Sequence, residues 1–285
     1  MKVLVLGGNG YLGKKTVQML RANGADVVCT VRDDNVRGAY DVEGAKAVSP
    51  AAGDVLDAMR DTKYDYVINT VCRYARGGSS YEEIIEANLV YPLQMLDALA
   101  DNGVTDFVTM GTGLKNDTNL YSFSKSKFSE FGRFYSYDRN INFTELKPEM
   151  FYGYDEPRGR FLPDMVYKMK RGEPVETTIG TQRRDIIRVS DVVEAIKIVL
   201  LSELKGYNEI PVGTGEAPSI SEITDYIWEK TGRRSAVNKG AIPMRRNEPD
   251  SVADISVISR LAEWKPVAWQ DGLLEMINKT EVDEI

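Results

Sequence analysis

The chain has no histidine, only two cysteines and no long apolar run. Without histidine, Ser-His-Asp triads and the commonest zinc ligand are excluded, so acid–base chemistry must come from Tyr, Lys, Asp, Glu or Cys, and we expect no metal. The cysteines, Cys29 and Cys72, each fall at a predicted strand, which indicates buried thiols in a reducing compartment. No apolar run approaches the ~18 residues of a membrane span, so we expect no membrane partner.

The rest of the composition is that of an ordinary globular protein of 285 residues. Its 36 basic and 43 acidic residues give a net charge of −7, which argues against a nucleic-acid partner. The N-terminus enters an apolar run at once, without a basic region or a cleavage site. We therefore expect no signal peptide and a cytoplasmic location.

The first thirteen residues combine an apolar run with a glycine-rich turn. Val3–Leu6 is typical of a buried strand, and Gly7, Gly10 and Gly13 follow it with the spacing G-x-x-G-x-x-G. Such glycines allow a tight turn, close approach of the backbone to a pyrophosphate, and close packing of a helix on a strand. The helix that begins next points its N-terminal N–H groups at an anion. The order of strand, glycines and helix predicts dinucleotide binding.

Apolar strands alternate with helical patterns through the first half of the chain. This alternation predicts an α/β fold, a Rossmann-type doubly wound parallel sheet. A capping box, Ser80-x-x-Glu83, opens a long helix that ends near Asn102. The expected strands are 25–31, 46–48, 66–71, 105–110 and 142–146, and the other expected helices are 11–23, one from residue 53, and 121–138.

After Pro148 the pattern becomes mixed and predicts a smaller C-terminal α/β lobe. A second capping box, Ser219-x-x-Glu222, begins one of its helices. We expect loops at 151–159 and 243–250, helices at 161–171, 190–201 and 269–279, and strands at 185–189 and 207–212. The predicted domains are an NAD(P)-binding domain of residues 1–147, to which 184–204 return, and a substrate-binding lobe of 148–183 and 205–285.

Tyr121 and Lys125 could form a proton-transfer pair that needs no histidine. At i and i+4 their side chains share one helix face, and a nearby ammonium lowers the pKa of a phenol. Only this pair follows the carboxyl end of a central strand, where ligands of doubly wound sheets bind. The same Y-x-x-x-K spacing occurs at Tyr11/Lys15, in the glycine turn, and at Tyr226/Lys230, outside the nucleotide fold.

Further short motifs follow in order along nearly the whole chain. They are Gly53-Asp54-Val55, Asn88 in the long helix, Lys147-Pro148-x-x-Phe-Tyr-Gly153, Arg183 to Asp191, Tyr207 to Gly215, Val252-Ala-Asp254 and Trp264-Lys-Pro266. Together with the glycine turn and the Tyr121/Lys125 pair, they make the chain resemble the extended short-chain dehydrogenase/reductases, the NAD-dependent epimerase/dehydratase family that modifies nucleotide sugars.

The resemblance implies a role for each matching residue. Tyr121 would be the general acid/base, and Lys125 would hold the nicotinamide ribose and lower the tyrosine pKa. Thr112 would bond the reacting oxygen of the substrate, while Thr109, inside the strand, is the weaker candidate. The other implied cofactor contacts are Gly7, Gly10, Tyr11, Leu12, Gly13, Thr70, Pro148 and Met150, with Asp54 and Val55 at the adenine. The implied substrate contacts, besides Thr112, are Glu149, Arg184 and Arg246, the two arginines at the sugar nucleotide's diphosphate.

The end of the second strand bears on the choice of cofactor. NAD-binding relatives place there an acidic residue that bonds the adenosine ribose 2′-hydroxyl. Our alignment puts Val31 at that position, and the next residue, Arg32, suits a 2′-phosphate. We therefore expect NADP, although Asp33, one residue later, keeps NAD possible.

The segment around Thr112 bears on the reaction. Thr112 precedes Gly113-Leu114 rather than the Asp-Glu pair of sugar 4,6-dehydratases. Fewer residues separate Thr112 from Tyr121 along the sequence than in most epimerases. The segment looks most like nucleotide-sugar 4-ketoreductases such as the CDP-abequose and CDP-paratose synthases. This resemblance implies NADPH-dependent reduction of the 4-keto group of a nucleotide-diphosphate-linked 6-deoxyhexose. The alternatives are an NAD-dependent nucleotide-sugar epimerase and a cofactor-binding regulator without turnover, which the intact catalytic set disfavours.

The resemblance also bears on the oligomeric state and on the substrate. Relatives of this family usually dimerise through two helices of each subunit, which correspond to 81–102 and 121–138, so a homodimer is expected by resemblance. Lys147, Glu149 and Arg188 depart from the usual family residues near the expected substrate pocket. The base and the stereochemistry of the sugar nucleotide therefore stay undetermined.

Overall fold

The computed structural model describes residues 1–32, 44–60, 62–74, 78–245 and 248–282. The chain divides into two compact units. The first consists of Met1–Lys147 and Val193–Ile210, and the second of Pro148–Val192 and Pro211–Ile285. The chain returns to the first unit later than the predicted 184–204, because Ile186–Arg188 pairs with a strand of the second unit.

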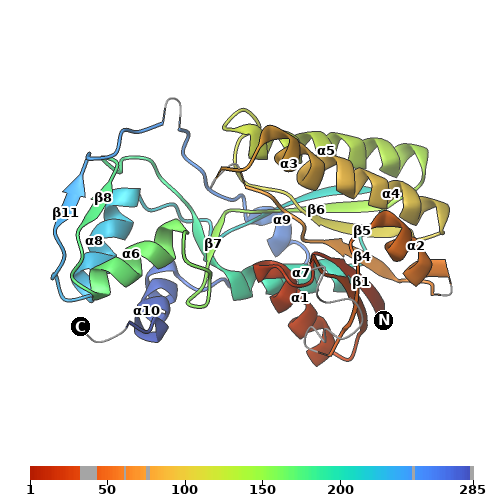
Figure 1. The fold of residues 1–285 in the computed structure, drawn as a ribbon, viewed down its shortest axis with the longest axis horizontal. Helices are drawn as coiled ribbons and strands as arrows, with labels where there is room; N and C mark the ends of the chain where they lie inside the picture. The colour runs from red at the N-terminus through yellow and green to blue at the C-terminus, as the bar shows by residue number, and fades with distance from the viewer. Residues whose placement is uncertain (33–43, 61, 75–77, 246–247, 283–285) are drawn as a thin grey trace. The chain divides into compact units, whose positions relative to one another are not determined.

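The first unit is built on a seven-stranded parallel sheet with the strand order β10-β6-β5-β4-β1-β2-β3 (Figure 1). The order reverses at β1, whose Val5 pairs with Cys29 of β2 on one side and Ile68 of β4 on the other. This topology confirms the predicted doubly wound sheet, in which ligands bind beyond the carboxyl ends of the strands at the reversal. The strands are β1 (Lys2–Leu6), β2 (Asp26–Thr30), β3 (Lys46–Val48), β4 (Tyr66–Asn69), β5 (Asp106–Met110), β6 (Asn142–Pro148) and β10 (Tyr207–Val212).

Helices cover both faces of this sheet. Figure 1 shows α3, α4 and α5 on one face and α1 and α7 on the other. Their apolar stripes pack on strands that are buried on both sides, as in other parallel sheets. The helices are α1 (Tyr11–Ala22), α2 (Ala52–Arg60), α3 (Tyr81–Ile85), η2 (Glu86–Val90), α4 (Tyr91–Asp101), α5 (Leu120–Asp138) and α7 (Val189–Leu201).

The predicted long helix after Ser80 is interrupted. Its capping box is present as expected, since Ser80 Oγ accepts a hydrogen bond from Glu83 N. The five residues of η2, however, form a π-helical turn before α4 begins. Pro92 lies in the first turn of α4 and has no N–H to donate, which removes a regular helical hydrogen bond at this point. The chain is therefore helical over the predicted range, and the irregular turn inside it was not predicted.

The π-turn carries Asn88, which is fully buried. Its side-chain amide donates to the carbonyl oxygen of Arg73 and to Ser124 Oγ, and its carbonyl accepts from Arg73 N. Asn88 thus fastens the segment that follows β4 to helix α5. The next residue of α5 is Lys125, so this contact lies beside the candidate catalytic pair.

The core of the first unit is apolar and rich in aromatic side chains. Phe107 of β5 stacks on Phe143 of β6, and Phe128 of α5 meets both edge-on. Gly132 of α5 leaves room for this cluster, because a Cβ there would lie 2.2 Å from the Phe143 ring. Helix α5 therefore approaches the sheet closely enough to bury its inner face.

Only one of the two cysteines behaves as predicted. Cys29 lies in β2 and is fully buried. Cys72 lies beyond the end of β4 and is half-buried. The expectation of a strand over 66–71 was too long, and this moves Cys72 into the segment at the carboxyl end of the sheet.

The second unit contains two small parallel sheets and helices. The sheets are β7 (Met150–Tyr152) with β9 (Ile186–Arg188), and β8 (Val175–Thr177) with β11 (Val237–Lys239). Of these four three-residue strands, β9 lies within the predicted strand 185–189, whereas β7, β8 and β11 were not predicted, because so short a strand shows no alternation, and residues 151–152 were wrongly expected to be loop. The helices are α6 (Phe161–Lys170), α8 (Ile220–Lys230), α9 (Ser256–Ser259) and α10 (Trp269–Lys279). The capping box of α8 is present as predicted, with Ser219 Oγ accepting from Glu222 N.

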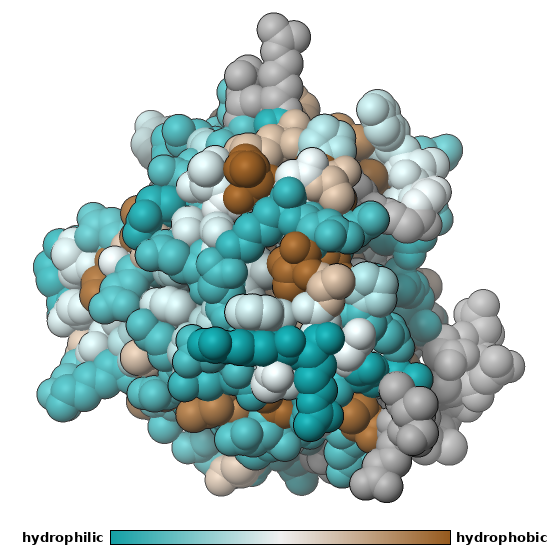
Figure 2. Space-filling model, turned by 90° about the vertical axis from the view of Figure 1, so that its left-hand side faces the viewer, coloured by the Kyte–Doolittle hydropathy of each residue, from teal (hydrophilic) through white to brown (hydrophobic). Residues whose placement is uncertain are grey.

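The surface of the second unit is mainly polar. Figure 2 shows the side that carries β8, β11 and α8, where hydrophilic side chains surround separate hydrophobic ones. Exposed apolar side chains of this unit include Ile179, Ile242, Met244 and Val252. Within the described part of the chain, none of the helices has the length and hydropathy needed to cross a bilayer.

Candidate functional site

The glycine turn has the close contacts that a pyrophosphate site requires. Gly7 follows β1 with φ +82°, and its N–H donates to Thr30 Oγ1 at 2.9 Å. A Cβ at Gly13 would lie 2.1 Å from the carbonyl oxygen of Gly7, and one at Gly10 would lie 3.2 Å from it. Thr70 Oγ1 donates to the carbonyl oxygen of Leu6 at 2.8 Å and so fixes the turn from β4's side.

Helix α1 begins at this turn with an open N-terminus. The N-cap Gly10 offers no capping side chain, and the first turn contains no acidic residue. The first N–H groups of a helix have no partners inside the helix, and they lie at the positive end of its dipole. Leu12 is buried beneath them, so its backbone but not its side chain faces outward. These residues fit a dinucleotide's pyrophosphate.

The residues expected to contact the adenine and its ribose differ in their exposure to solvent. Asp54, in the first turn of α2, is exposed, whereas Val55 is buried in the core and its N–H donates to Ala51 O. Val31 is buried after β2 and Arg32 is exposed beside it. Asp33 lies outside the described residues.

The three Y-x-x-x-K pairs differ in their environment. Lys15 Nζ lies 5.2 Å from the ring centre of Tyr11, and Lys230 Nζ lies 5.4 Å from that of Tyr226, as in ordinary pairs along a helix. Tyr121 and Lys125, by contrast, are 8% and 2% exposed. An ionisable pair is buried in this way only when specific partners hold it.

Those partners come from the ends of β4 and β5. Lys125 Nζ donates to the carbonyl oxygen of Val71 at 3.0 Å. The Thr112 hydroxyl lies close enough to the Tyr121 phenol to act on its pKa, and the ring of Tyr74 lies 4.9 Å from the ring of Tyr121. The structure therefore brings together all three predicted catalytic residues. Thr109 instead accepts a hydrogen bond from Asn69 within the sheet.

Burial dominates the electrostatics of this pair. It raises the pKa of the Tyr121 phenol well above its usual value, with Cys72 and Tyr74 raising it further and the Thr112 hydrogen bond opposing them. Burial also lowers the pKa of the Lys125 ammonium, against the attraction of Cys72 and Glu145. The net shift of the Tyr121 pKa is thus upward, opposite to the lowering expected from Lys125, and the phenol is protonated.

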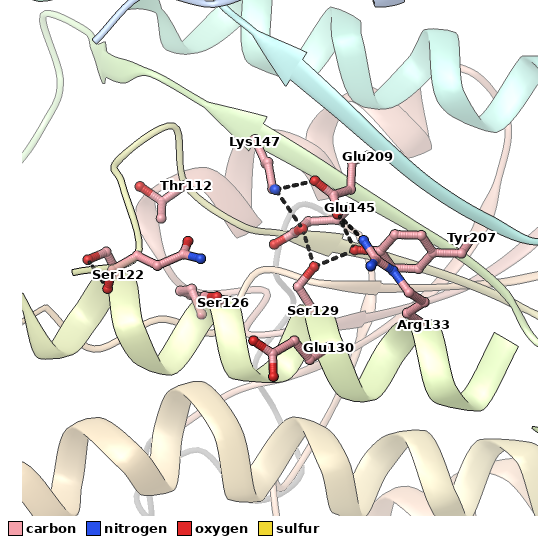
Figure 3. A pocket seen from close by; sticks show the side chains of 12 residues that line it. Thr112, Ser122, Ser126, Ser129, Glu130, Arg133, Glu145, Lys147, Tyr207 and Glu209 are labelled. Atoms are coloured by element: carbon pink, nitrogen blue, oxygen red, sulfur yellow. Dashed lines mark hydrogen bonds and ion pairs between the residues drawn. The ribbon is translucent and has the colours of Figure 1, made fainter. Parts of the chain in front are cut away.

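A polar cavity of about 270 Å³ lies beside Thr112 and Lys125, between α5 and the strands β6 and β10 (Figure 3). Apart from Lys125, the charged groups that line it had no predicted role. One signal was available, because Glu145 is the one charged residue of the predicted strand 142–146. The lining residues are Thr112, Asn116, Ser122, Lys125, Ser126, Ser129, Glu130, Arg133, Glu145, Lys147, Tyr207 and Glu209.

Several predicted ligand contacts belong to the second unit. Arg184 is buried there, and its guanidinium donates to Glu248 Oε1 at 2.7 Å and to the carbonyl oxygen of Pro249 at 2.5 Å. Met150 begins β7 and packs on this unit's core, directly after Pro148 and Glu149. Arg246 lies outside the described residues.

Glu149 is a buried carboxyl group with one close partner. Ser251 Oγ donates to Glu149 Oε2 at 2.5 Å. Burial raises the pKa of Glu149 to about 7, against the effects of the Ser251 hydrogen bond and the Arg184 charge. Near neutral pH this carboxyl group therefore changes its charge. No cluster of three or more metal-ligating side chains occurs among the residues that the structure describes.

Comparisons with known proteins agree with this geometry. A model described as the NAD dependent epimerase/dehydratase family matches residues 3–213. CDP-abequose synthase of Salmonella typhimurium is 28% identical over 97% of this chain and 97% of its own. dTDP-4-dehydro-6-deoxy-D-allose reductase of Streptomyces bikiniensis is 25% identical over 96% of this chain and 94% of its own.

Solved structures show the same fold. UDP-glucose 4-epimerase of Thermus thermophilus, in complex with NAD, superposes with a TM-score of 0.82 and covers 98% of this chain and 99% of that chain. The two sequences are 22% identical, a level at which the likeness establishes the fold rather than the reaction.

We predict that Glu149→Gln removes a pH dependence of stability. Because the folded protein holds the Glu149 proton up to about pH 7, the unfolded chain loses this proton first as the pH rises from acid. The free energy of unfolding of the wild type therefore falls between the ordinary glutamate pKa and about pH 7, by about 3 kcal/mol from this group. The variant lacks this fall and becomes relatively more stable at alkaline pH.

Urea unfolding at several pH values across this interval measures the effect. Glu216→Gln, which changes an exposed carboxylate of the same unit, serves as the matched control and should follow the wild type. Parallel stability curves for Glu149→Gln and the wild type would contradict the prediction.

Proposed function

The chain belongs to the NAD dependent epimerase/dehydratase family, and we propose that it uses NADPH to reduce the 4-keto group of a nucleotide-diphosphate-linked 6-deoxyhexose. The observation that carries this proposal is the burial of Tyr121 beside Lys125, with the Thr112 hydroxyl close to the phenol. One relative is by name a reductase of a dTDP-linked 4-dehydro-6-deoxy sugar, which supports the same substrate class.

In the proposed reaction the protein supplies orientation and a proton. When bound, the reduced nicotinamide supplies a hydride to the carbonyl carbon. Tyr121 donates its phenolic proton to the carbonyl oxygen, and the Thr112 hydroxyl holds that oxygen by a hydrogen bond. Since burial keeps the phenol protonated, Tyr121 begins as an acid, which is the form that a reduction needs. Lys125 holds the nicotinamide ribose.

The remaining binding roles are part of the same proposal. The glycine turn and α1 hold the pyrophosphate, Arg32 the ribose 2′-phosphate, and Asp54 the adenine. In the second unit, Glu149 and Arg184 contact the sugar nucleotide, and Arg246 joins Arg184 at the diphosphate. The other proposed cofactor contacts are Tyr11, Leu12, Val55, Thr70, Pro148 and Met150.

The alternative is a nucleotide-sugar epimerase with resident NAD. The likeness to UDP-glucose 4-epimerase in complex with NAD favours it. An epimerase must first oxidise its substrate, for which the tyrosine has to start as a base. The buried Val31 followed by the exposed Arg32, which suits a 2′-phosphate, favours the reductase.

We also propose a homodimer formed through the helices of residues 81–102 and 121–138. Exposed aromatic side chains on α5 support it, because monomers rarely expose several together. Ile84 of α3 and Leu96 of α4 are buried inside the first unit and do not contribute to this interface. The exposed aromatic side chains on α5 are Phe123, Phe131, Phe134 and Tyr137.

A panel of CDP-, dTDP-, GDP- and UDP-linked 4-keto-6-deoxyhexoses, tested with NADPH, measures the proposed activity. We predict NADPH oxidation with at least one member. Tyr121→Phe should lower kcat with that substrate by about 10²- to 10⁴-fold, because it removes the proton donor. Tyr226→Phe, which changes the tyrosine of the Tyr226/Lys230 pair in the second unit, should leave kcat unchanged. Purified protein that carries stoichiometric NAD and ignores NADPH would support the epimerase instead.

Arg32→Ala tests the cofactor. The loss of a charge-assisted contact to the 2′-phosphate should raise KM for NADPH by about tenfold or more, while KM for NADH changes little. Arg139→Ala is the control, because it removes an exposed arginine at the C-terminal end of α5. An equal change of both KM values in Arg32→Ala would refute the 2′-phosphate role.

A further inference from the structure

Four side-chain oxygens form a row along the wall of the cavity beside Lys125 (Figure 3). Glu145 Oε2 lies 2.7 Å from Ser129 Oγ, which lies 2.5 Å from the hydroxyl oxygen of Tyr207. That oxygen in turn lies 2.5 Å from Glu209 Oε1. All three separations are those of hydrogen bonds between oxygen atoms. We call these four residues the proton row.

The proton row has more oxygen–oxygen contacts than its hydroxyl groups have hydrogens. Three oxygen–oxygen contacts need three hydrogens, but the Ser129 and Tyr207 hydroxyls supply only two, and ionised carboxylates supply none. With both carboxylates ionised, one of the three contacts would bring two hydrogen-bond acceptors together without a hydrogen between them. A third proton, on Glu145 or Glu209, gives every contact its hydrogen.

The surroundings favour Glu145 as the carrier of that proton. Burial raises the pKa of Glu145, against the effects of Lys147, Ser129 and Lys125. At Glu209, burial acts in the same direction, but hydrogen bonds from Lys147 and Tyr207 outweigh it and lower the pKa. The row then runs one way, with Glu145 donating to Ser129, Ser129 to Tyr207, and Tyr207 to Glu209.

The two ends of the proton row lie in different surroundings. The Glu145 side chain is 3% exposed, and its Oε1 lies where a Cβ at Gly111 would stand, one residue before Thr112. It shares the cavity with Lys125. At the other end, the Glu209 side chain is 33% exposed and pairs with the exposed Arg133 at 3.1 Å. The row thus joins solvent to the interior beside Lys125.

We propose that the proton row carries an excess proton and returns protons from solvent to Lys125 and Tyr121 after each turnover. This inference rests on the proposed function, because each reduction takes one proton from Tyr121. The cavity is large enough for water, and its polar lining supplies partners for it. A water there bridges Glu145 to Lys125.

The steps balance for one proton per turnover. The O–H bond of Tyr121 breaks as the substrate oxygen gains its proton, and the Lys125 ammonium, on the same helix face, then reprotonates the phenolate. Glu145 gives its proton through the bridging water to the Lys125 amine. Ser129 and Tyr207 each pass one proton toward Glu145 and accept another, and Glu209 takes the replacement from solvent. Lys147, 3.6 Å from Glu145 Oε2 and bonded to Glu209, balances the charge of both carboxyl groups.

Infrared spectroscopy tests the excess proton without any turnover. At neutral pH, the spectrum of the wild type minus that of Glu145→Gln should contain the C=O stretching band of a protonated carboxyl group. Glu149 is present in both proteins, so its band cancels. A difference spectrum with only an ionised carboxylate band would overturn the excess proton.

Tyr207→Phe tests the relay. This change removes one oxygen of the row and keeps the ring that stacks on Phe143. Steady-state kcat should fall by about tenfold or more, because protons no longer return quickly. A single turnover, which uses the proton already on Tyr121, should keep its rate, and added imidazole should restore kcat. Ser129→Ala interrupts the row elsewhere and should behave in the same way.

Tyr135→Phe is the matched control, since it removes a phenol–carboxylate hydrogen bond of α5, to Asp97, away from the cavity. It should leave both rates unchanged. An equal loss of single-turnover and steady-state rates in Tyr207→Phe, or no loss in either, would overturn the relay. If the wild type reduces no 4-keto sugar, the proposed function fails, while the infrared result still decides whether the row holds its proton.

Discussion

The burial of Tyr121 and Lys125 on one face of α5 is the constraint on which the rest of the site depends. Burying two ionisable groups costs free energy unless each finds partners. Lys125 donates a hydrogen bond to Val71 O, and Tyr121 packs against the ring of Tyr74 with the Thr112 hydroxyl nearby. The π-turn contributes through Asn88, which ties the segment after β4 to α5 next to Lys125. An irregular helix and the loops after two strands are thus held in place around one pair of side chains.

The same burial explains why a carboxyl group stands in the middle of a core strand. Glu145 lies on β6 among Phe143 and Leu146, where an apolar residue would be the usual choice. Its carboxyl group faces a polar cavity rather than the aromatic core, and it belongs to a hydrogen-bonded network that includes Lys147. Buried polar networks of this kind fix a particular arrangement when every member is satisfied. Here the arrangement also supplies a route for protons.

Local patterns predicted the framework, and non-local contacts account for what was missed. The glycine spacing and both capping boxes act within a few residues, so they could be seen in the sequence. The π-turn depends on Pro92 together with partners of Asn88 that lie far along the chain. The proton row joins Ser129 and Glu145 to Tyr207, 78 residues beyond Ser129. The contact of Arg184 with Glu248, 64 residues away, was equally invisible, as were strands too short to alternate.

In the proposed reaction, the chain delivers a hydride from NADPH to a sugar carbonyl carbon. The most direct test of this reaction is to supply NADPH deuterated at the hydride-donating carbon, together with a 4-keto-6-deoxyhexose nucleotide, and to analyse the sugar product by mass spectrometry and NMR. We predict one deuterium at C4 of each product molecule and one equivalent of NADP formed. A product without deuterium, released by protein that holds its own NAD, would contradict the claim.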